Sequence, residues 1–129
     1  MSVKILVVDD EVPVATVIQA NLELEGYEVT TAYDGNQGLL RARELKPDLI
    51  LLDVMMPEKD GWTVLQELRG DPELYKTPVI MLTALSQESD ISRGWESGVD
   101  CYLTKPFDPL EMIEICKRIL EAGDLDLDM

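Results

Sequence analysis

The chain has 129 residues, of which 46% are hydrophobic and 29% charged, with a formal net charge of −15 and no histidine. This composition favours one globular domain, and its acidic balance disfavours direct nucleic-acid binding, because a phosphate backbone requires a basic face. The lack of histidine excludes Ser/His/Asp and Cys/His catalysis within the chain, and the lack of a long apolar run or signal-peptide pattern predicts a cytoplasmic protein without a membrane span.

The predicted elements alternate between strand and helix. Short β-branched apolar runs without polar alternation indicate strands that are buried on both faces, whereas apolar residues spaced three or four apart indicate amphipathic helices. In chain order, we predict strand 3–8, helix 11–25, strand 27–31, helix 35–46, strand 48–52, helix 61–69, strand 78–82, helix 86–97, strand 100–104, and a final helix that ends at about residue 121.

Proline, glycine and aspartate mark several of these boundaries. Pro13 suits the first turn of its helix, where a missing N–H costs nothing, and Gly26 is a typical residue just after a helix. Asp108 is the expected N-cap of the last helix. We therefore predict one domain over residues 1–121, followed by an acidic tail or the start of a linker at 122–129.

This order of elements predicts the fold class. Alternating strands and helices indicate a parallel sheet with helices on both faces, and right-handed crossovers restrict the possible topologies. Five strands in about 120 residues match a flavodoxin-like, doubly wound α/β fold with strand order 2-1-3-4-5. The strand at 27–31 alternates polar and apolar residues, which favours a position nearer an edge.

Polar residues follow four of the predicted strands and should meet at one edge of the sheet. They are Asp9 and Asp10, Asp53, Thr83, and Lys105. Ligands bind at the carboxyl ends of strands in such folds. Three adjacent carboxylates repel one another, and carboxylates together with a backbone carbonyl suit Mg²⁺. With Lys105 as a second cation and Thr83 as a hydroxyl donor, a carboxylate there could accept a phosphoryl group and form an acyl phosphate.

Four segments carry a specific resemblance to a known family. ILVVDDE (5–11), PDLILLDVMMPEKDG (47–61), PVIMLTA (78–84) and DCYLTKPF (100–107) resemble the response-regulator receiver domain of two-component signalling. The resemblance spans about residues 3–121. It is nearest to receivers of winged-helix transcription regulators, notably at Gly94, Glu96, Gly98, Asp100 and Glu111.

The resemblance implies a role for each residue of this edge. Asp53 would be the phospho-acceptor. Asp10, Asp53 and the backbone carbonyl of Met55 would bind Mg²⁺ directly, and Asp9 would bind it through water. Lys105 would pair with the phosphoryl oxygens, and the Lys105–Pro106 bond would be cis.

The resemblance also implies how the signal enters and leaves the domain. The phosphoryl group would come from a phosphohistidine on a histidine kinase or a histidine phosphotransfer protein, in agreement with the absence of histidine here. Thr83 would be the switch hydroxyl and Tyr102 the aromatic switch. The chain would be no conventional enzyme, because it would catalyse only its own phosphotransfer and slow dephosphorylation.

One surface departs from the pattern of the family. The face of the fourth helix, fifth strand and fifth helix usually carries charged pairs, whereas this sequence has apolar residues there. We interpret Ile91, Trp95 and Ile113 as a partner or homodimer surface, with ordinary core packing as the alternative.

Three other functions remain open. A phosphatase with an aspartate nucleophile would need a second aspartate at the position of Met55. A constitutive interaction module would normally have lost one of Asp9, Asp10, Asp53 or Lys105. A flavin-binding protein would need a Ser/Thr/Gly-rich phosphate loop after the first strand, where this chain has two aspartates.

Overall fold

The computed structural model describes residues 2–84 and 99–127 and has the predicted order of elements. The predicted helix at 86–97 lies outside the described residues. The elements are β1 Lys4–Val8, α1 Val12–Leu24, β2 Glu28–Ala32, α2 Gly35–Leu45, β3 Leu49–Asp53, α3 Gly61–Arg69, β4 Val79–Ala84, β5 Cys101–Lys105 and α5 Pro109–Leu127.

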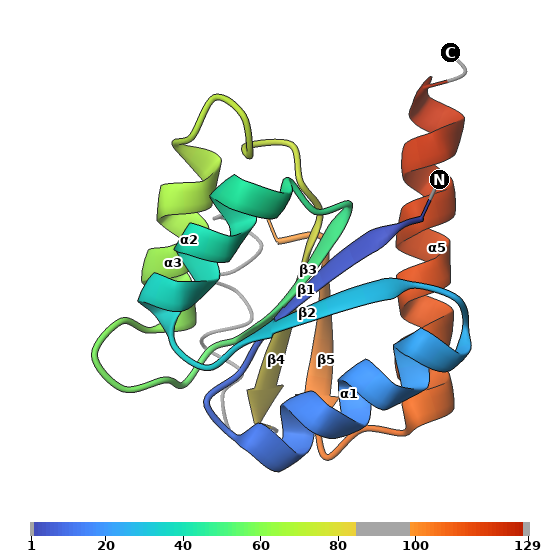
Figure 1. The fold of residues 1–129 in the computed structure, drawn as a ribbon, viewed down its shortest axis with the longest axis horizontal. Coiled ribbons are helices and arrows are strands. Elements are labelled where there is room, and N and C mark those ends of the chain that lie inside the picture. The colour runs from blue at the N-terminus through green and yellow to red at the C-terminus, as the bar shows by residue number, and fades with distance from the viewer. Residues whose placement is uncertain (1, 85–98, 128–129) are drawn as a thin grey trace.

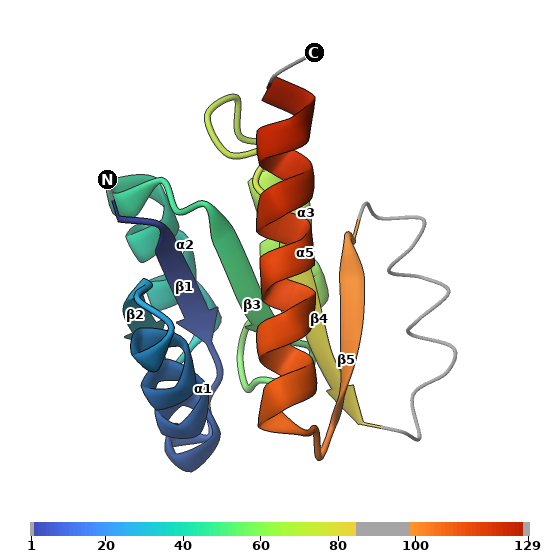
Figure 2. The same ribbon diagram turned by 90° about the vertical axis from the view of Figure 1, so that its right-hand side faces the viewer.

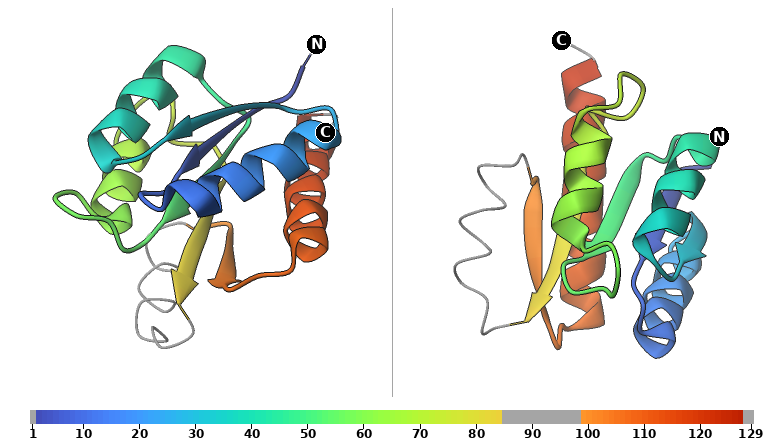
Figure 3. Two further views of the ribbon diagram at one scale, coloured as in Figure 1. Left: turned by 60° about the horizontal axis from the view of Figure 1, so that its bottom comes forward. Right: turned by 90° about the vertical axis from the view of Figure 1, so that its left-hand side faces the viewer.

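The five strands form one parallel sheet in the order β2-β1-β3-β4-β5, which confirms the predicted fold class. Helices α1 and α5 cover one face of the sheet (Figure 2), and α2 and α3 cover the other (Figure 1; Figure 3, right). Such a doubly wound arrangement leaves the carboxyl ends of the strands open at one edge.

Two hydrophobic layers explain why the central strands show no polar alternation. On β3, Leu49 and Leu51 pack into the layer beneath α1 and α5, whereas Ile50 and Leu52 pack into the layer beneath α2 and α3. Successive side chains of a strand point to opposite faces, so a strand covered on both faces must be apolar at every position. The edge strand β2 is only partly buried, in agreement with its alternating sequence.

Local signals at the helix ends agree with the structure. Pro13 lies in the first turn of α1, and Gly26, just beyond that helix, has a φ of +93°, a conformation that glycine adopts without strain. The backbone N–H of Leu110 donates to the Asp108 carboxylate at the start of α5, as expected of a cap. The Lys105–Pro106 peptide bond is cis, as the resemblance implied.

The last helix differs from the prediction. Helix α5 continues to Leu127, beyond the predicted end at about residue 121 and through residues that were expected to form an acidic tail or the start of a linker. The intervening Gly123 is compatible with this, because one glycine in a helix costs only about 1 kcal/mol relative to alanine. No helix in the described part of the chain is long and apolar enough to cross a membrane.

Candidate functional site

The polar residues predicted to meet at the carboxyl edge of the sheet do so, and three of them belong to the strands themselves. Asp53 is the last residue of β3, Lys105 is the last residue of β5, and Thr83 is the next-to-last residue of β4. Each strand runs one or two residues further than predicted. Asp53 pairs with Leu82, and Thr83 pairs with Thr104 on β5, so the ladder fixes the height of each side chain along the edge.

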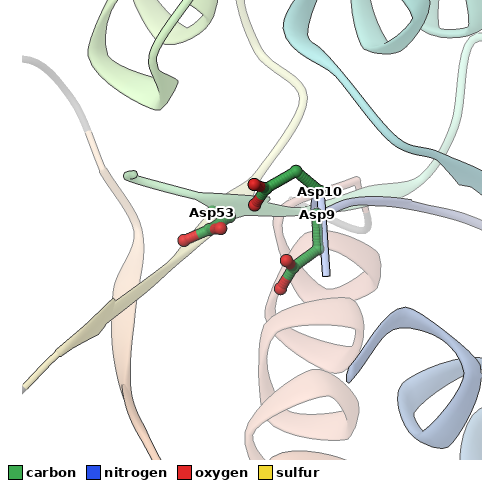
Figure 4. A group of neighbouring side chains, drawn as sticks. All are labelled: Asp9, Asp10 and Asp53. Atoms are coloured by element: carbon green, nitrogen blue, oxygen red, sulfur yellow. The ribbon is translucent and has the colours of Figure 1, made fainter. Parts of the chain in front are cut away.

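Three carboxylates gather at the ends of β1 and β3 (Figure 4). Carboxylate oxygens of Asp9, Asp10 and Asp53 lie within 4.8 Å of one another. Asp9 is 0% exposed and Asp53 only 4% exposed. Carboxylates this deeply buried require compensating charge or hydrogen bonds.

Lys105 provides part of that compensation. Its Nζ lies 2.8 Å from Asp9 Oδ2, 3.5 Å from Asp53 Oδ2 and 3.7 Å from Glu11 Oε1. Backbone groups provide more: the N–H of Glu11 donates to Asp9 Oδ1 at 2.9 Å, and the N–H of Met55 donates to Asp53 Oδ1 at 3.3 Å. The lysine is therefore nearest to Asp9, while Asp53 has only longer contacts.

Asp53 has a strongly perturbed proton affinity as a consequence. Burial, followed by the charge of Asp9, raises its pKa to about 7, although Lys105 opposes this shift. Burial alone lowers the pKa of Lys105, but its hydrogen bond to Asp9 and the surrounding carboxylate charges outweigh burial and raise it. The lysine therefore stays protonated, whereas the carboxyl group of Asp53 holds its proton more tightly than an exposed aspartate does.

The acidic cluster has the donors that a hard divalent cation requires. Asp10 Oδ1 is buried and has no hydrogen-bond partner among residues 2–84 and 99–127. An orphaned carboxylate oxygen beside two other carboxylates is stabilised by a cation with oxygen ligands. The cluster is therefore consistent with a magnesium site.

The loop between β3 and α3 holds Asp53 in place through a glycine. Asp60 caps α3, because its Oδ1 accepts the N–H of Thr63 at 2.9 Å, and the N–H of Gly61 donates to the Val54 carbonyl at 2.9 Å. A side-chain carbon on Gly61 would overlap the backbone carbonyl of Asp53 and lie 2.9 Å from Cα of Val54. The helix can approach the acidic strand this closely only with glycine at that position.

The two residues assigned to the switch lie on neighbouring strands. Thr83 is buried, and its hydroxyl donates to the Ala84 carbonyl at 3.3 Å. Tyr102 on β5 is partly buried against the hydrophobic layer beneath α2 and α3, where its strand position pairs with Met81. Thr83 thus lies at the acidic edge of the sheet, whereas Tyr102 lies three residues before Lys105, the last residue of β5.

The structure describes only part of the predicted partner surface. Ile91 and Trp95 lie outside the described residues. Ile113 on α5 is partly buried and packs against the layer beneath α1 and α5, so core contacts account for part of its apolar surface. Cys116 is buried and Cys101 partly buried, and both are free thiols.

Sequence reasoning missed two features of the site. Lys105 pairs with Glu11 as well as with the aspartates, and it lies nearer to Asp9 than to Asp53. The position of Glu11, directly after the Asp9–Asp10 pair, was the available signal for the first feature. The sequence gives no indication of which aspartate lies nearer to Lys105, because that depends on how β1, β3 and β5 pack.

The chain matches the family model described as the response regulator receiver domain over residues 5–117. It is 46% identical over 121 residues to the DNA-binding dual master transcriptional regulator RpaA of Synechocystis, covering 94% of this chain and 50% of that protein. It is 47% identical over 125 residues to the alkaline phosphatase synthesis transcriptional regulatory protein PhoP of Bacillus subtilis. This match covers 97% of this chain and 51% of that protein. The chain thus spans about half the length of these curated relatives.

Solved structures agree with the sequence matches. A putative response regulator from Chloroflexus aurantiacus superposes with a TM-score of 0.89 at 36% identity, covering 94% of this chain and 99% of that one. The chemotaxis protein CheY4 of Vibrio cholerae superposes with a TM-score of 0.87 at 31% identity, covering 92% of this chain and 99% of that one. The acidic edge, the sheet that carries it and the match over residues 5–117 agree, so the chain belongs to the response-regulator receiver family and is a phospho-accepting signalling switch, not a conventional enzyme.

Proposed function

We propose that Asp53 is the residue that accepts the phosphoryl group, from a phosphohistidine on a histidine kinase or a histidine phosphotransfer protein. The observation that carries this proposal is a buried carboxylate that lies 3.5 Å from a lysine ammonium group and beside two further carboxylates. These surroundings raise the pKa of Asp53 to about 7. A carboxylate that is poorly neutralised by its surroundings is poised to bind cations and to react as a nucleophile.

The proposed metal is Mg²⁺, held directly by Asp10, Asp53 and the backbone carbonyl of Met55 and through water by Asp9. When bound, it neutralises the carboxylates and draws negative charge from the phosphoryl oxygens. This assignment is supported by the orphaned oxygen of Asp10. It is also supported by the backbone hydrogen bond and the ion pair with Lys105 that already engage Asp9.

The chain's own groups perform the transfer. A carboxylate oxygen of Asp53 forms a bond to phosphorus, while the bond between phosphorus and the donor imidazole breaks and leaves its electron pair on nitrogen. Lys105 donates hydrogen bonds to the phosphoryl oxygens and offsets the charge that the new group brings to the edge. Thr83 is the hydroxyl that then turns to the phosphoryl group, and Tyr102 follows it inward.

Phosphorylation by a small acyl phosphate tests the acceptor. With acetyl phosphate and Mg²⁺, we expect the mass of the intact protein to increase by one phosphoryl group, and we expect no increase for Asp53→Ala. The matched control is Asp34→Ala, because Asp34 also follows a strand but caps α2 through the N–H of Gln37. Undiminished phosphorylation of Asp53→Ala would assign the acceptor elsewhere.

We further propose that residues 1–121 act as the switch unit in the cytoplasm and that their output is a protein contact. The curated relatives of about twice this length are transcriptional regulators by name, one of them described as DNA-binding. A net charge of −15 disfavours a DNA contact by this chain itself. DNA binding in a longer protein would therefore depend on segments other than this one.

The proposed contact surface comprises Ile91 and Trp95, which lie outside the described residues, and Ile113 on α5. Phosphorylation is expected to favour a homodimer through this surface. Gel filtration of the phosphorylated protein should then show a dimer fraction that Trp95→Ala reduces. Tyr75→Ala is the control, because Tyr75 is an exposed aromatic residue in the α3–β4 loop. Equal dimer fractions for the wild type and Trp95→Ala would remove Trp95 from the interface.

A further inference from the structure

An open apolar groove of about 570 Å³ lies between the start of α1 and the segment that joins β5 to α5. Val14 and Val17 line it from α1, and Phe107 and Pro109 line it from the opposite side. Glu11 and Lys105 supply its charged groups. The volume falls within the range of about 300–1,000 Å³ that is typical of small-molecule sites.

The groove leads directly to the acidic edge of the sheet. Lys105 lines the groove, and the same ammonium group lies 3.5 Å from Asp53 Oδ2. Its side chain is 18% exposed, and its ammonium group also contacts Asp9 and Glu11. A ligand in the groove can therefore place one end against Lys105 and the adjacent Asp53.

The charges and the apolar walls define the chemistry of such a ligand. Its inner end should be the phosphoryl group, whose oxygens Lys105 contacts in the transfer proposed above. Its body should be apolar, to cover Val14, Val17 and Phe107. A second anionic group along the body would be repelled by Glu11, whose side chain is 59% exposed. A protein of net charge −15 is also a poor host for polyanions.

We propose that this groove binds the acyl group of a small phosphodonor and that the chain prefers acyl phosphates with an apolar alkyl chain to acetyl phosphate. The proposal rests on Asp53 as the acceptor. In the reaction, an Asp53 carboxylate oxygen forms a bond to phosphorus, and the bond between phosphorus and the acyl oxygen breaks. The alkyl carboxylate leaves with that electron pair, so the reaction needs no other reactant.

Donors that differ only in chain length test the preference. Acetyl phosphate and butyryl phosphate release carboxylic acids of similar acidity, so their intrinsic reactivities are close. Each methylene group fully buried on binding contributes about fourfold in affinity. For the two additional methylenes in an open groove, we expect phosphorylation at low donor concentration to be roughly three- to tenfold faster with butyryl phosphate, as read by intact mass.

A pair of valines on one helix provides the matched variants. Val17 lines the groove and is 46% exposed, whereas Val12 is 51% exposed and does not line it. Asparagine and valine have similar helix propensities, so Val17→Asn and Val12→Asn should both fold. We expect Val17→Asn to reduce the butyryl-to-acetyl rate ratio at least twofold and Val12→Asn to leave it unchanged.

Phosphoramidate, a donor without an acyl group, separates this proposal from the assignment of Asp53. If phosphoramidate labels Asp53 while butyryl and acetyl phosphate react equally fast, the acyl site is overturned and the acceptor is retained. If no donor labels Asp53, the acceptor assignment itself fails. Val17→Asn could instead leave the butyryl-to-acetyl rate ratio unchanged and slow phosphoryl transfer from a phosphohistidine protein. That result would overturn the acyl site and show that a protein donor occupies the groove.

An unreactive ligand provides a readout that is independent of leaving groups. Butylphosphonate carries an anionic end and an alkyl chain, whereas methylphosphonate keeps only the anionic end. We expect butylphosphonate to inhibit labelling by phosphoramidate at a lower concentration than methylphosphonate in the wild type. Val17→Asn should narrow that difference, and equal inhibition by both phosphonates in the wild type would contradict the groove assignment.

Discussion

Asp53→Asn is expected to stabilise the Mg²⁺-free protein at pH 8 by up to about 4 kcal/mol, because a tenfold change in proton affinity corresponds to about 1.4 kcal/mol. The folded-state pKa of Asp53 is raised to about 7 by burial and by the charge of Asp9, whereas an unfolded aspartate has a pKa of about 3.9. Ionising the folded Asp53 therefore costs free energy, and asparagine keeps the shape of the side chain without the charge.

The sign of the pH dependence follows from proton linkage. Between pH 4 and pH 7 the folded state holds more protons on Asp53 than the unfolded state does, so its contribution to stability falls as pH rises through this window. The advantage of Asp53→Asn should therefore be small near pH 4, grow through the window and level off above pH 7. Urea unfolding at pH 5 and pH 8 in the presence of a chelator measures this difference.

Mg²⁺ should reduce the advantage of Asp53→Asn in stability at pH 8. A cation that binds the folded state stabilises it by mass action, and it binds ionised carboxylates, so wild type should gain more from Mg²⁺ at pH 8 than Asp53→Asn. Glu23→Gln is the control for net charge, because Glu23 is an exposed carboxylate on α1 outside the acidic cluster. If Glu23→Gln and Asp53→Asn stabilised the protein equally at pH 8, general charge repulsion would explain the effect and the raised pKa of Asp53 would not.

Gly61→Ala is expected to impair both stability and phosphorylation. The added methyl carbon would overlap the Asp53 carbonyl and lie 2.9 Å from Cα of Val54, and backbone atoms cannot move aside as a flexible side chain can. Forcing additional volume into a packed region typically costs about 1–3 kcal/mol. Because the obstructed carbonyl belongs to the acceptor itself, we also expect phosphorylation to slow by about tenfold or more, since a 1 Å misplacement can cost ~100-fold.

A second glycine provides the control. At Gly70, which ends α3, an added carbon would lie 3.5 Å from the Gln66 carbonyl oxygen, which is an ordinary contact distance. Gly70→Ala should therefore keep near-normal phosphorylation in a mass assay with acetyl phosphate and near-normal stability in urea. If Gly61→Ala phosphorylated as fast as Gly70→Ala, the close approach of α3 to β3 would have no role in positioning Asp53.

Strand ends show where sequence patterns are weakest. The predicted strands stopped before Asp53, Thr83 and Lys105, because polar residues after an apolar run are typical of loops. The backbones of these residues nevertheless pair in the sheet, since backbone hydrogen bonds do not depend on the polarity of the side chain. The functional residues are thus held by the rigid ladder itself, which fixes their positions better than a loop would.

The apolar strands and the spacing of the helices were sufficient to predict the parallel sheet, because a strand covered on both faces must be apolar at every position. The residue types at the strand ends likewise predicted an acidic edge suited to phosphoryl acceptance. The close pairing of Lys105 with Asp9, the absence of space at Gly61 and the groove beside Val17 required the folded chain. Each of these features is a distance between segments far apart in sequence, and such distances arise from packing, which no local pattern of residues records.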